Sequence, residues 1–366
     1  MRVAVIGAGL GGLCLAQGLR GAGVEVEVYE RDPDVHGRFQ GYRIGLGDLG
    51  VGALRACLPE RLHGLLDATT GRLSGSRENY GPGLEFTGAR PPMTATTVDR
   101  QVLRQLLLTG IDVRFGKRLG GYRVLGDGRV RAEFTDGSAT EADLLVGADG
   151  INSAVRAQLS PGVRPEDTGV RCVIGRTPLT DRFAALVPGF GAGVSDGEVM
   201  LMIGLMRFRR PPREAGAELG VALPDVGDYA RWVLMPAPEQ EELPPRDAVL
   251  AAIEGWHPDV RALVEAADPE HTSWLSIRVV RPGVRWPLGP VTLLGDAIHA
   301  TSPSGGNGAN TALHDARRLR DLLVEPGTSL LDAVDTYETA MFTYGAQAVE
   351  HSVAALDQFL PGRRAA

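Results

Sequence analysis

The first thirty residues show the apolar pattern of a strand, a helix and a second strand. Residues 2–6 form a short apolar run followed by a glycine-rich turn, which is typical of a buried strand. A helical pattern then extends from about Gly12 to Arg20 and ends at Gly21. Residues 24–29 alternate valine with polar residues, which predicts another strand. A strand–helix–strand unit of this kind favours a parallel sheet.

The rest of the chain shows two kinds of sequence pattern. Between about 170 and 280, extended apolar runs alternate with loops rich in proline and glycine, which favours a second, mainly antiparallel layer. Residues 70–97 are rich in Gly, Thr, Ser and Pro, and predict only short strand-like pieces. The remaining pattern predicts helices at 48–58, 99–108, 246–254, 258–266, 309–323 and 329–358, and strands near 111–115, 121–125, 129–134, 143–147, 172–179, 198–208, 229–235, 272–280 and 290–295.

The composition narrows the class of protein. The chain has 366 residues, of which 43% are hydrophobic, and its 49 glycines lack the every-third-residue period of collagen. A formal net charge of −7 argues against a protein built to neutralise nucleic-acid phosphates. Three scattered cysteines cannot form a disulfide framework, which indicates a reducing compartment. Glycines interrupt the apolar stretch from Val3 to Leu19, so we expect a cytoplasmic protein without a secretory signal or membrane span.

The turn after the first strand carries Gly7, Gly9 and Gly12 at the G-x-G-x-x-G spacing. The first glycine permits the tight turn, the second lets the backbone approach a pyrophosphate, and the third lets the helix pack on the sheet. The start of the helix that follows offers N–H groups and a partial positive charge to phosphates. Glu30 ends the second strand 18 residues after Gly12. An acid at this position binds the ribose of a cofactor such as FAD or NAD.

Two further motifs follow strand-like runs. The pair Asp149 and Gly150 ends one of them, and by itself it is equally compatible with an ordinary turn. Asp296 ends another and is well placed to bind a ribose or ribityl hydroxyl. A loop through Pro303 and a glycine cluster then open a helix. There the backbone of residues 308–310 offers N–H groups to an electron-rich ligand edge.

In this order and spacing, the three motifs resemble those of the FAD-dependent aromatic hydroxylases, single-component flavoprotein monooxygenases of the para-hydroxybenzoate hydroxylase type. The resemblance covers about residues 1–170 and 285–325, and the middle of the chain carries no motif of that family. It implies FAD and, transiently, NADH or NADPH as cofactors. The residues that it places at the cofactors are Gly7, Gly9, Leu10, Gly12, Glu30, Arg31, Arg43, Arg100, Asp149, Asp296, Pro303, Gly308, Ala309 and Asn310.

The resemblance also implies individual roles. It places Asp149 at both FAD and the nicotinamide cofactor, and Asp296 at the ribityl chain. Arg43 would reach the cofactor pyrophosphate or the nicotinamide cofactor, and Arg100 would lie near the flavin. Backbone donors at the helix start, such as Ala309, would stabilise the negative charge of the reduced flavin.

The activity implied by the resemblance is hydroxylation or epoxidation of a hydrophobic, aromatic or polycyclic small molecule, as in secondary metabolism. NAD(P)H would reduce the FAD, and O2 would form a C4a-hydroperoxyflavin that oxygenates the substrate. We expect no metal, no nucleic-acid partner, and a monomer or homodimer. A flavin reductase or dehydrogenase, a non-enzymatic flavoprotein and a halogenase are the alternatives. The Trp-x-Trp-x-Ile-Pro signature of halogenases is absent from the sequence.

Candidate substrate contacts lie in the middle of the chain. Met200 and Met202 share one face of a predicted strand, while Leu201 points the other way, so that both faces are apolar. The methionine face predicts either the wall of a substrate cavity or ordinary core. Arg231 is a candidate partner for an anionic substrate group, or else a structural arginine. Trp232 is a further candidate contact.

His299 follows the Asp296 motif and is interpreted either as a loop histidine bonded to backbone or as a proton relay to the substrate. The cysteines Cys14, Cys57 and Cys172 form no C-x-x-C pair, so a flavin disulfide reductase is not expected. Buried free thiols are the prediction for all three.

Together these features predict an α/β protein, α+β overall. A Rossmann-like FAD-binding domain would carry an inserted, mainly antiparallel β-sheet domain for the substrate, and helices would end the chain. The predicted ranges are 1–72, 96–170 and 281–328 for the discontinuous FAD-binding domain, 73–95 and 171–280 for the substrate domain, and 329–366 for the C-terminal helical segment.

Overall fold

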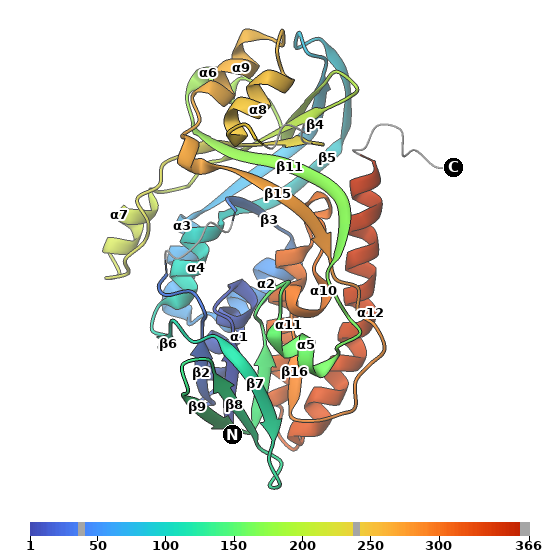
Figure 1. Cartoon of the computed structure of the whole chain (residues 1–366). Helices are drawn as coiled ribbons and strands as arrows, with labels where there is room; N and C mark the ends of the chain where they lie inside the picture. Colours follow the sequence, from blue (N-terminus) through green and yellow to red (C-terminus); the bar gives the residue numbers. More distant parts are fainter. Residues whose placement is uncertain (36–40, 237–241, 359–366) are drawn as a thin grey trace.

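The computed structural model describes residues 1–35, 41–236 and 242–358, with a parallel sheet at one end of the molecule and a larger sheet at the other (Figure 1). The strand order of the parallel sheet is β16-β10-β1-β2-β6, and every pair in it is parallel. Its strands are β1 (Arg2–Ile6), β2 (Glu25–Tyr29), β6 (Val113–Arg114), β10 (Leu144–Gly147) and β16 (Val291–Leu293). The predicted parallel sheet is thereby confirmed.

The central strands of the parallel sheet are aliphatic because both of their faces are covered. Helices α1 (Leu10–Gly21), α2 (Asp48–Cys57) and α11 (Gly308–Leu323) pack against one another. A three-stranded antiparallel sheet of β7 (Leu119–Val124), β8 (Val130–Phe134) and β9 (Ala139–Ala142) lies beside the parallel strands. The ring of Phe134 stacks on Tyr29 with centroids 4.6 Å apart, which joins the two sheets.

The larger sheet has the order β15-β11-β14-β13-β12-β4-β5-β3 and is antiparallel except between β12 and β4. Its strands are β3 (Arg43–Leu46), β4 (Thr70–Tyr80), β5 (Phe86–Asp99), β11 (Glu166–Pro178), β12 (Gly191–Ser195), β13 (Met200–Met206), β14 (Tyr229–Met235) and β15 (Thr272–Val279). The mainly antiparallel layer predicted from the apolar runs is confirmed, although most of its members are separated widely in the sequence.

Helices cover one face of the large sheet, which we call its outer face. These are α6 (Asp181–Ala184), α8 (Pro245–Ala252) and α9 (Pro258–Glu265), at the top of Figure 1. Leu201 and Trp232 are fully buried in the core between them and the sheet. Both longer helices begin with a proline in their first turn, where its missing N–H has no intrahelical role. The opposite, inner face is turned toward the parallel sheet (Figure 1).

Residues 70–97 differ from the prediction of short strand-like pieces. Apart from the turn at 81–85, they belong to β4 and β5, two long strands that pair along most of their length. The prolines Pro91 and Pro92 do not interrupt this pairing because they lie at a register shift between Gly75 and Arg77. A β-bulge needs no ladder hydrogen bond from its extra residues, so proline is tolerated there.

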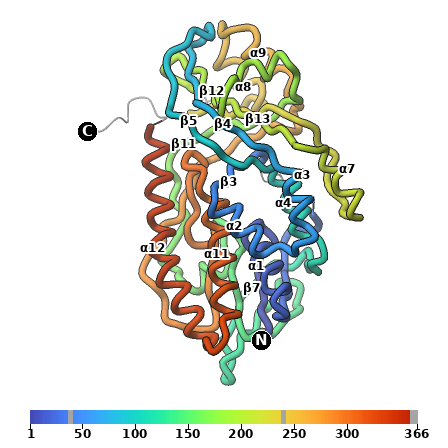
Figure 2. The backbone as a smooth tube through the Cα atoms, turned by 180° about the vertical axis from the view of Figure 1, so that it is seen from behind, coloured from blue at the N-terminus to red at the C-terminus, as the bar shows by residue number. Residues whose placement is uncertain are grey.

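The helix α12 (Leu330–Asp357) runs alongside α11, as the view from behind shows (Figure 2). It was predicted as part of a separate C-terminal segment, whose last residues, 359–366, lie outside the described structure. Its Tyr337 donates a hydrogen bond to the carbonyl of Leu293 in β16 at 2.9 Å. Trp286 and Phe342 pack with ring centroids 5.1 Å apart. The described part of this helix is therefore packed on the parallel-sheet half.

The remaining elements are short helices and turns in the connections between the strands and helices already described. They are α3 (His63–Ala68), α4 (Arg100–Leu108), α5 (Ala154–Leu159), α7 (Pro212–Ala217), α10 (Asp296–His299), and the 3-10 turns η1 (Glu60–Leu62), η2 (Pro269–His271) and η3 (Pro303–Gly305). Among the described residues, no helix has the length and apolarity that a membrane crossing requires.

The division into domains stays a prediction. Several residues near the predicted domain boundaries, however, pair in a different sheet from the one that the predicted ranges imply. The whole of β3 and the first residues of β4 pair in the large sheet, although both fall within the range 1–72. The strand β11 begins at Glu166, before the predicted start at residue 171. Long strands thus continue from the cofactor half into the large sheet.

Candidate active site

The turn between β1 and α1 has the close packing that its glycines predict. Gly7 has a φ of +110°, and a Cβ there would collide with the carbonyl of Ala148. A Cβ on Gly12 would collide with the carbonyl of Gly7. A Cβ on Gly9, in contrast, would have no atom within 4 Å. Two of the glycines are therefore required by the fold, whereas Gly9 faces open space next to the buried Leu10 that begins the helix.

Glu30 is buried at the end of β2 and bonds to that same turn. Its Oε2 accepts the N–H of Ala8 at 2.8 Å, and its Oε1 accepts the N–H of Asp32 at 3.0 Å. Each oxygen keeps a second lone pair with which it could accept a ribose hydroxyl. The predicted Arg31 is half-buried directly beside it. The backbone N–H groups of Ala8 and Asp32 thus orient the Glu30 carboxylate beside the turn proposed to bind the cofactor.

Arg104 of α4 also bonds to the turn and was missed in the sequence. Its Nε donates to the carbonyl of Ala8 at 2.9 Å, and its Nη1 donates to the carbonyl of Val35 at 2.7 Å. The predicted Arg100 lies one helical turn earlier, where its backbone N–H donates to Tyr42. The available signal was an arginine on the apolar face of an amphipathic helix, since Arg104 is 5% exposed among buried leucines.

The second motif is held by backbone donors and by a buried arginine. Asp149 Oδ2 accepts the N–H of Ala154 at 2.7 Å, while its Oδ1 is buried without a hydrogen-bond partner in the described structure. Burial raises the pKa of this carboxyl above its usual value, against the hydrogen bonds that lower it. Arg156 donates to the carbonyls of Ile151 and Ala297, both at 2.7 Å. It thereby ties the second motif to the third.

The third motif presents one exposed acid from a buried turn. Gly295 has a φ of +60°, which favours glycine, and its N–H donates to Asp315 Oδ2 at 2.7 Å. Asp296 is exposed, although the residues on both sides of it are buried. Its carboxylate is therefore available to a ligand at the end of β16.

His299 lies behind this turn in a buried hydrogen-bond network. Its Nε2 lies 2.7 Å from Asp315 Oδ2, and Tyr344 donates to Asp315 Oδ1 at 2.5 Å. Burial lowers the pKa of His299, but the Asp315 carboxylate outweighs burial, so that the net pKa is raised. A Cβ on Gly345 of α12 would lie 2.8 Å from the imidazole. The histidine is therefore bonded to a carboxylate rather than to backbone, and the proton relay stays a prediction.

The loop after α10 is held by α12. The N–H of Ser302 donates to Ser352 Oγ at 3.0 Å. A Cβ on Gly305 would lie 2.9 Å from the Cα of Ser352, so the loop and the helix are in direct contact. The predicted Pro303 is exposed on this loop. The long C-terminal helix thus positions the third motif at several points.

The start of α11 is joined to β3 by Asn310. Its Oδ1 accepts the N–H of Gly47 at 2.9 Å, and its Nδ2 donates to the carbonyl of Gly45 at 3.0 Å. The helix bonds begin with the N–H of Thr311 on Asn307 at 2.8 Å. The preceding N–H groups, of the predicted residues Gly308, Ala309 and Asn310, are those that an α-helix leaves without an intrahelical acceptor. The side chain of Asn310 is a positioning group, and its backbone remains available.

The inner face of the large sheet is more open than the outer face. Met200, Met202 and Arg231 are half-buried there, in the alternation predicted from the sequence. Trp232 was predicted as a substrate contact, and this is corrected. It lies fully buried on the outer face, where its Nε1 donates to Thr177 Oγ1 at 3.1 Å. Neighbouring strand residues point to opposite faces, so Arg231 and Trp232 cannot line one cavity.

Arg43 lies under the large sheet beside Arg231. Its Nη1 donates to the carbonyl of Leu205 at 3.1 Å, and its guanidinium occupies the space above Gly204 that a Cβ would fill. Burial lowers the pKa of Arg43 to about 9, with the positive charge of Arg231 adding to the effect. The resemblance had connected this residue with cofactor phosphates, and the structure brings it to the substrate candidates.

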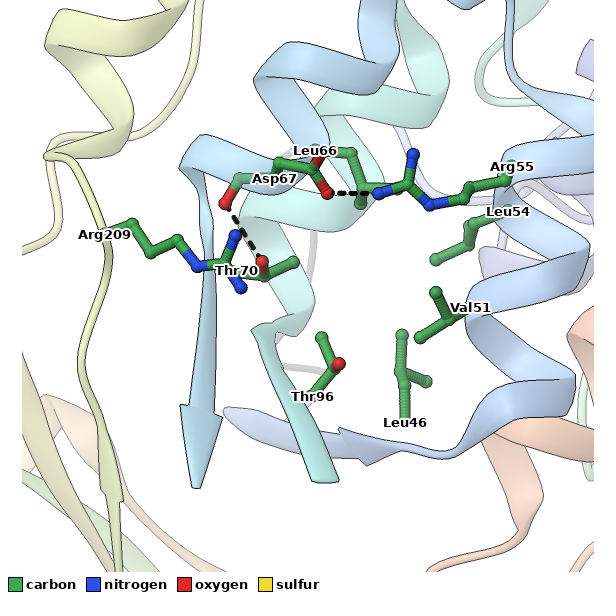
Figure 3. A pocket seen from close by; sticks show the side chains of 9 residues that line it. All are labelled: Leu46, Val51, Leu54, Arg55, Leu66, Asp67, Thr70, Thr96 and Arg209. Atoms are coloured by element: carbon green, nitrogen blue, oxygen red, sulfur yellow. Dashed lines mark hydrogen bonds and ion pairs between the residues drawn. The ribbon is translucent and has the colours of Figure 1, made fainter. Parts of the chain in front are cut away.

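A cavity of about 190 Å³ lies between β3, α2 and α3 (Figure 3). It is lined by Leu46, Val51, Leu54, Arg55, Leu66, Asp67, Thr70, Thr96 and Arg209. At its edge Arg55 and Asp67 form an ion pair at 2.6 Å, which Figure 3 shows. Its lining contains none of the predicted site residues. The three predicted cofactor motifs instead follow the carboxyl ends of the neighbouring strands β1, β10 and β16.

The cysteines are buried free thiols, as predicted. The thiols of Cys14 in α1 and Cys57 in α2 interact, and this interaction raises the pKa of Cys14 and lowers that of Cys57. Cys172 lies on the inner face of the large sheet.

Proteins with FAD-related names are similar to this chain over most of its length. The profile of a family described as "FAD binding domain" matches residues 1–352. A FAD-dependent urate hydroxylase of Klebsiella oxytoca is 33% identical, over 89% of this chain and 82% of its own. A dual O-methyltransferase/FAD-dependent monooxygenase of Cercospora beticola is 32% identical over 93% of this chain. The chain spans only 44% of that fungal protein's length.

Among solved structures, a Photorhabdus luminescens protein described as a FAD-containing monooxygenase is similar over 98% of both chains, with a TM-score of 0.84 and 30% identity. The similarity extends over both sheets and α12, so the whole arrangement recurs in that structure.

Proposed function

Because this chain belongs to the FAD-binding-domain family, we propose that it is an FAD-dependent monooxygenase that uses NADH or NADPH and O2. Its substrate would be a hydrophobic, aromatic or polycyclic small molecule, which it hydroxylates or epoxidises. One observation carries the proposal: three glycine-containing turns end β1, β10 and β16 side by side and lie below an open, apolar sheet face. Several similar proteins are named as FAD-dependent monooxygenases or hydroxylases.

The residues present fit FAD. Gly9 leaves the space that a pyrophosphate needs, and the start of α1 supplies backbone donors to it. Glu30 would hold the adenosine ribose, and the exposed Asp296 the ribityl chain. The orphaned, buried Oδ1 of Asp149 is a further acceptor at this site. When bound, FAD supplies hydride acceptance and O2 activation.

The protein's own contribution to the reaction is positioning and electrostatics. Backbone donors of Ala309 and Asn310 at the start of the 16-residue helix α11 would stabilise negative charge on a ligand edge without a charged side chain. Asn310 holds that helix against β3, so the donors are preorganised. The large sheet covers the site, and Met202 and Val233 on its inner face exclude water from the apolar part of a substrate.

The proposal is tested on purified protein. We expect a yellow protein with one FAD per chain, and NAD(P)H oxidation that an aromatic substrate stimulates. Mass spectrometry of the product formed under 18O2 should show one labelled oxygen atom. NADH and NADPH are compared in the same assay. Unlabelled product, or oxidation of NAD(P)H without any oxygenated product, would instead assign the protein to flavin reductases or dehydrogenases. Colourless protein that cannot be reconstituted with FAD would contradict the proposal altogether.

A further inference from the structure

The cavity beside α2 takes no part in the proposed reaction, because none of the residues assigned to the cofactor or the substrate lines it. Its closed end is aliphatic. Leu46 of β3, Leu54 of α2 and Leu66 of α3 are each at most 3% exposed, and Figure 3 shows their side chains around one space. Aliphatic walls offer water no hydrogen-bond partners, so this end suits an apolar group.

The size of the cavity matches one small ring. A cavity of about 150 Å³ with aliphatic and aromatic walls is sufficient to bind benzene. The cavity described here has a volume of about 190 Å³, and the half-buried Val51 adds a fourth aliphatic side chain to its wall. A single ring with one short substituent therefore fits this space, whereas the polycyclic substrates considered for the reaction are too large for it.

The mouth of the cavity is polar and carries one unbalanced positive charge. Arg55 and Asp67 pair at 2.6 Å, and their side chains are 45% and 44% exposed. Arg209 lies on the side opposite α2 (Figure 3), is exposed, and has no acidic partner in the described part of the chain. Its backbone N–H donates to the carbonyl of Thr70 at 3.3 Å, which fixes this segment at the mouth. A ligand with a single negative charge would balance Arg209.

The apolar wall is in contact with the residues that hold the start of α11. Leu46 immediately precedes Gly47, whose N–H donates to Asn310 Oδ1 at 2.9 Å. A Cβ on Gly50 would lie 2.5 Å from Asn310 Oδ1 and 3.2 Å from the Leu46 side chain, so both side chains pack on this glycine. A molecule that packs on Leu46 therefore acts on the segment that positions Asn310.

We propose that this cavity is an accessory binding site for a small apolar monoanion, a single ring or a short branched chain that carries one carboxylate. Its apolar part occupies the aliphatic end, and its carboxylate lies at the mouth beside Arg209. Through Leu46 and Gly50 the occupant shifts the backbone next to the start of α11, and so acts as an effector of the flavin site. This effector role rests on the proposed function, whereas the binding itself does not.

Binding is tested by 19F NMR on the purified, FAD-loaded protein, with 4-fluorobenzoate and fluorobenzene as probes. We expect 4-fluorobenzoate to bind with a dissociation constant of about 1 mM or lower, within the range open to a ligand of this size. It should bind about 3-fold more tightly than fluorobenzene, because an exposed ion pair contributes a factor of that order. Arg209→Gln should remove this preference and leave the affinity for fluorobenzene unchanged.

A second variant fills the cavity. Val51→Phe places a ring in the empty space, so it should weaken the binding of both probes at least about 10-fold. Because it fills a void, it should unfold at about the native temperature or above it. Leu49→Phe is the matched control, since Leu49 belongs to the same helix and is 61% exposed. It adds the same ring outside the cavity and should leave both affinities unchanged.

The effector role is read from the flavin spectrum. In the FAD-loaded protein, 4-fluorobenzoate should shift the flavin absorption with the half-saturation measured by NMR. Val51→Phe should abolish the shift at that site while its FAD content stays native. Binding that Val51→Phe abolishes but that leaves the native flavin spectrum unchanged would overturn the effector role.

Two results would overturn the site itself. Equal affinity of the native protein and Val51→Phe for 4-fluorobenzoate would place the probe elsewhere, and equal affinity of the native protein for the two probes would exclude recognition of the anion by Arg209. Failure of the proposed function is distinguishable from both, because 18O incorporation and NAD(P)H oxidation are measured separately and the NMR titration requires neither.

Discussion

The two halves of this molecule use buried charged groups in opposite ways. Around the parallel sheet, Glu30, Arg104, Arg156 and Asp315 each hold two or more hydrogen bonds, many of them to backbone. On the inner face of the large sheet, Arg43 holds one carbonyl, and the Nε of Arg231 has no partner among the described residues. A satisfied buried group helps to fix the structure, whereas an unsatisfied one, such as Oδ1 of Asp149 in the cofactor half, keeps hydrogen-bonding capacity for a ligand. The comparison predicts which substitutions reduce stability and which reduce binding.

The largest effect is expected for Asp315→Ala. This carboxylate accepts from Gly295, His299 and Tyr344, and its removal leaves all three without their acceptor in a closed core. Breaking such a buried network should lower the free energy of unfolding by about 3–5 kcal/mol. Urea unfolding of the apoprotein measures it. The matched control is Asp321→Ala, an exposed acid on the same helix, which should cost less than about 1 kcal/mol. Similar losses in both variants would contradict the comparison.

A second contrast lies between neighbouring residues of β13. Leu201 is completely buried in the outer core, so Leu201→Ala should lower the unfolding free energy by about 3 kcal/mol. Met202 is half-buried on the inner face, so Met202→Ala should cost about 1 kcal/mol or less and instead weaken substrate binding. Met202→Lys should raise the substrate concentration needed for half-maximal rate, or uncouple NAD(P)H oxidation from oxygenation. If these Met202 variants lower only thermal stability, this residue is ordinary core.

The glycines of the first motif allow the same comparison within one turn. Gly12→Ala forces a methyl group against the Gly7 carbonyl and should destabilise the apoprotein by about 1–3 kcal/mol. Gly9→Ala meets no protein atom, so its apoprotein should stay within about 1 kcal/mol of the native stability. Its FAD affinity should nevertheless fall at least about 10-fold if the open space receives the pyrophosphate. If Gly9→Ala bound FAD with native affinity, the pyrophosphate would not bind in the open space at Gly9.

The smallest effect concerns pH. The folded-state pKa of His299 is raised above the unfolded value of about 6.5, so its stabilising contribution is complete below that pH and is lost as the pH rises through the folded-state pKa. His314 has a pKa lowered mainly by burial, so its contribution should have the opposite sign. Unfolding free energies of His299→Gln and His314→Gln, each compared with the native protein, should therefore diverge in opposite directions with pH. If the two differences in unfolding free energy changed with pH in the same direction, Asp315 would not be holding a proton on His299.

Much of the parallel-sheet half could be predicted because its signals are local. The turn glycines, the strand that ends at Glu30 and the helix after residue 308 are each legible within about twenty residues. Arg104 could not be singled out, because an arginine on a helix reveals its acceptor only when the distant Ala8 carbonyl is in place. The role of α12 was missed for the same reason, since Tyr344 bonds to Asp315, which precedes it by 29 residues, and Ser352 bonds to Ser302, which precedes it by 50 residues.

The sequence by itself determined the cofactor-binding motifs, the alternation of β13 and β14, and the apolar character of both faces of β13. Only the tertiary structure decided which face is closed by helices and which is left open, and this separated Trp232 from Arg231. It also brought Arg43 from an early strand onto Gly204. Spacing along the chain encodes local backbone geometry, whereas burial and charge pairing depend on partners that long-range strand order brings together.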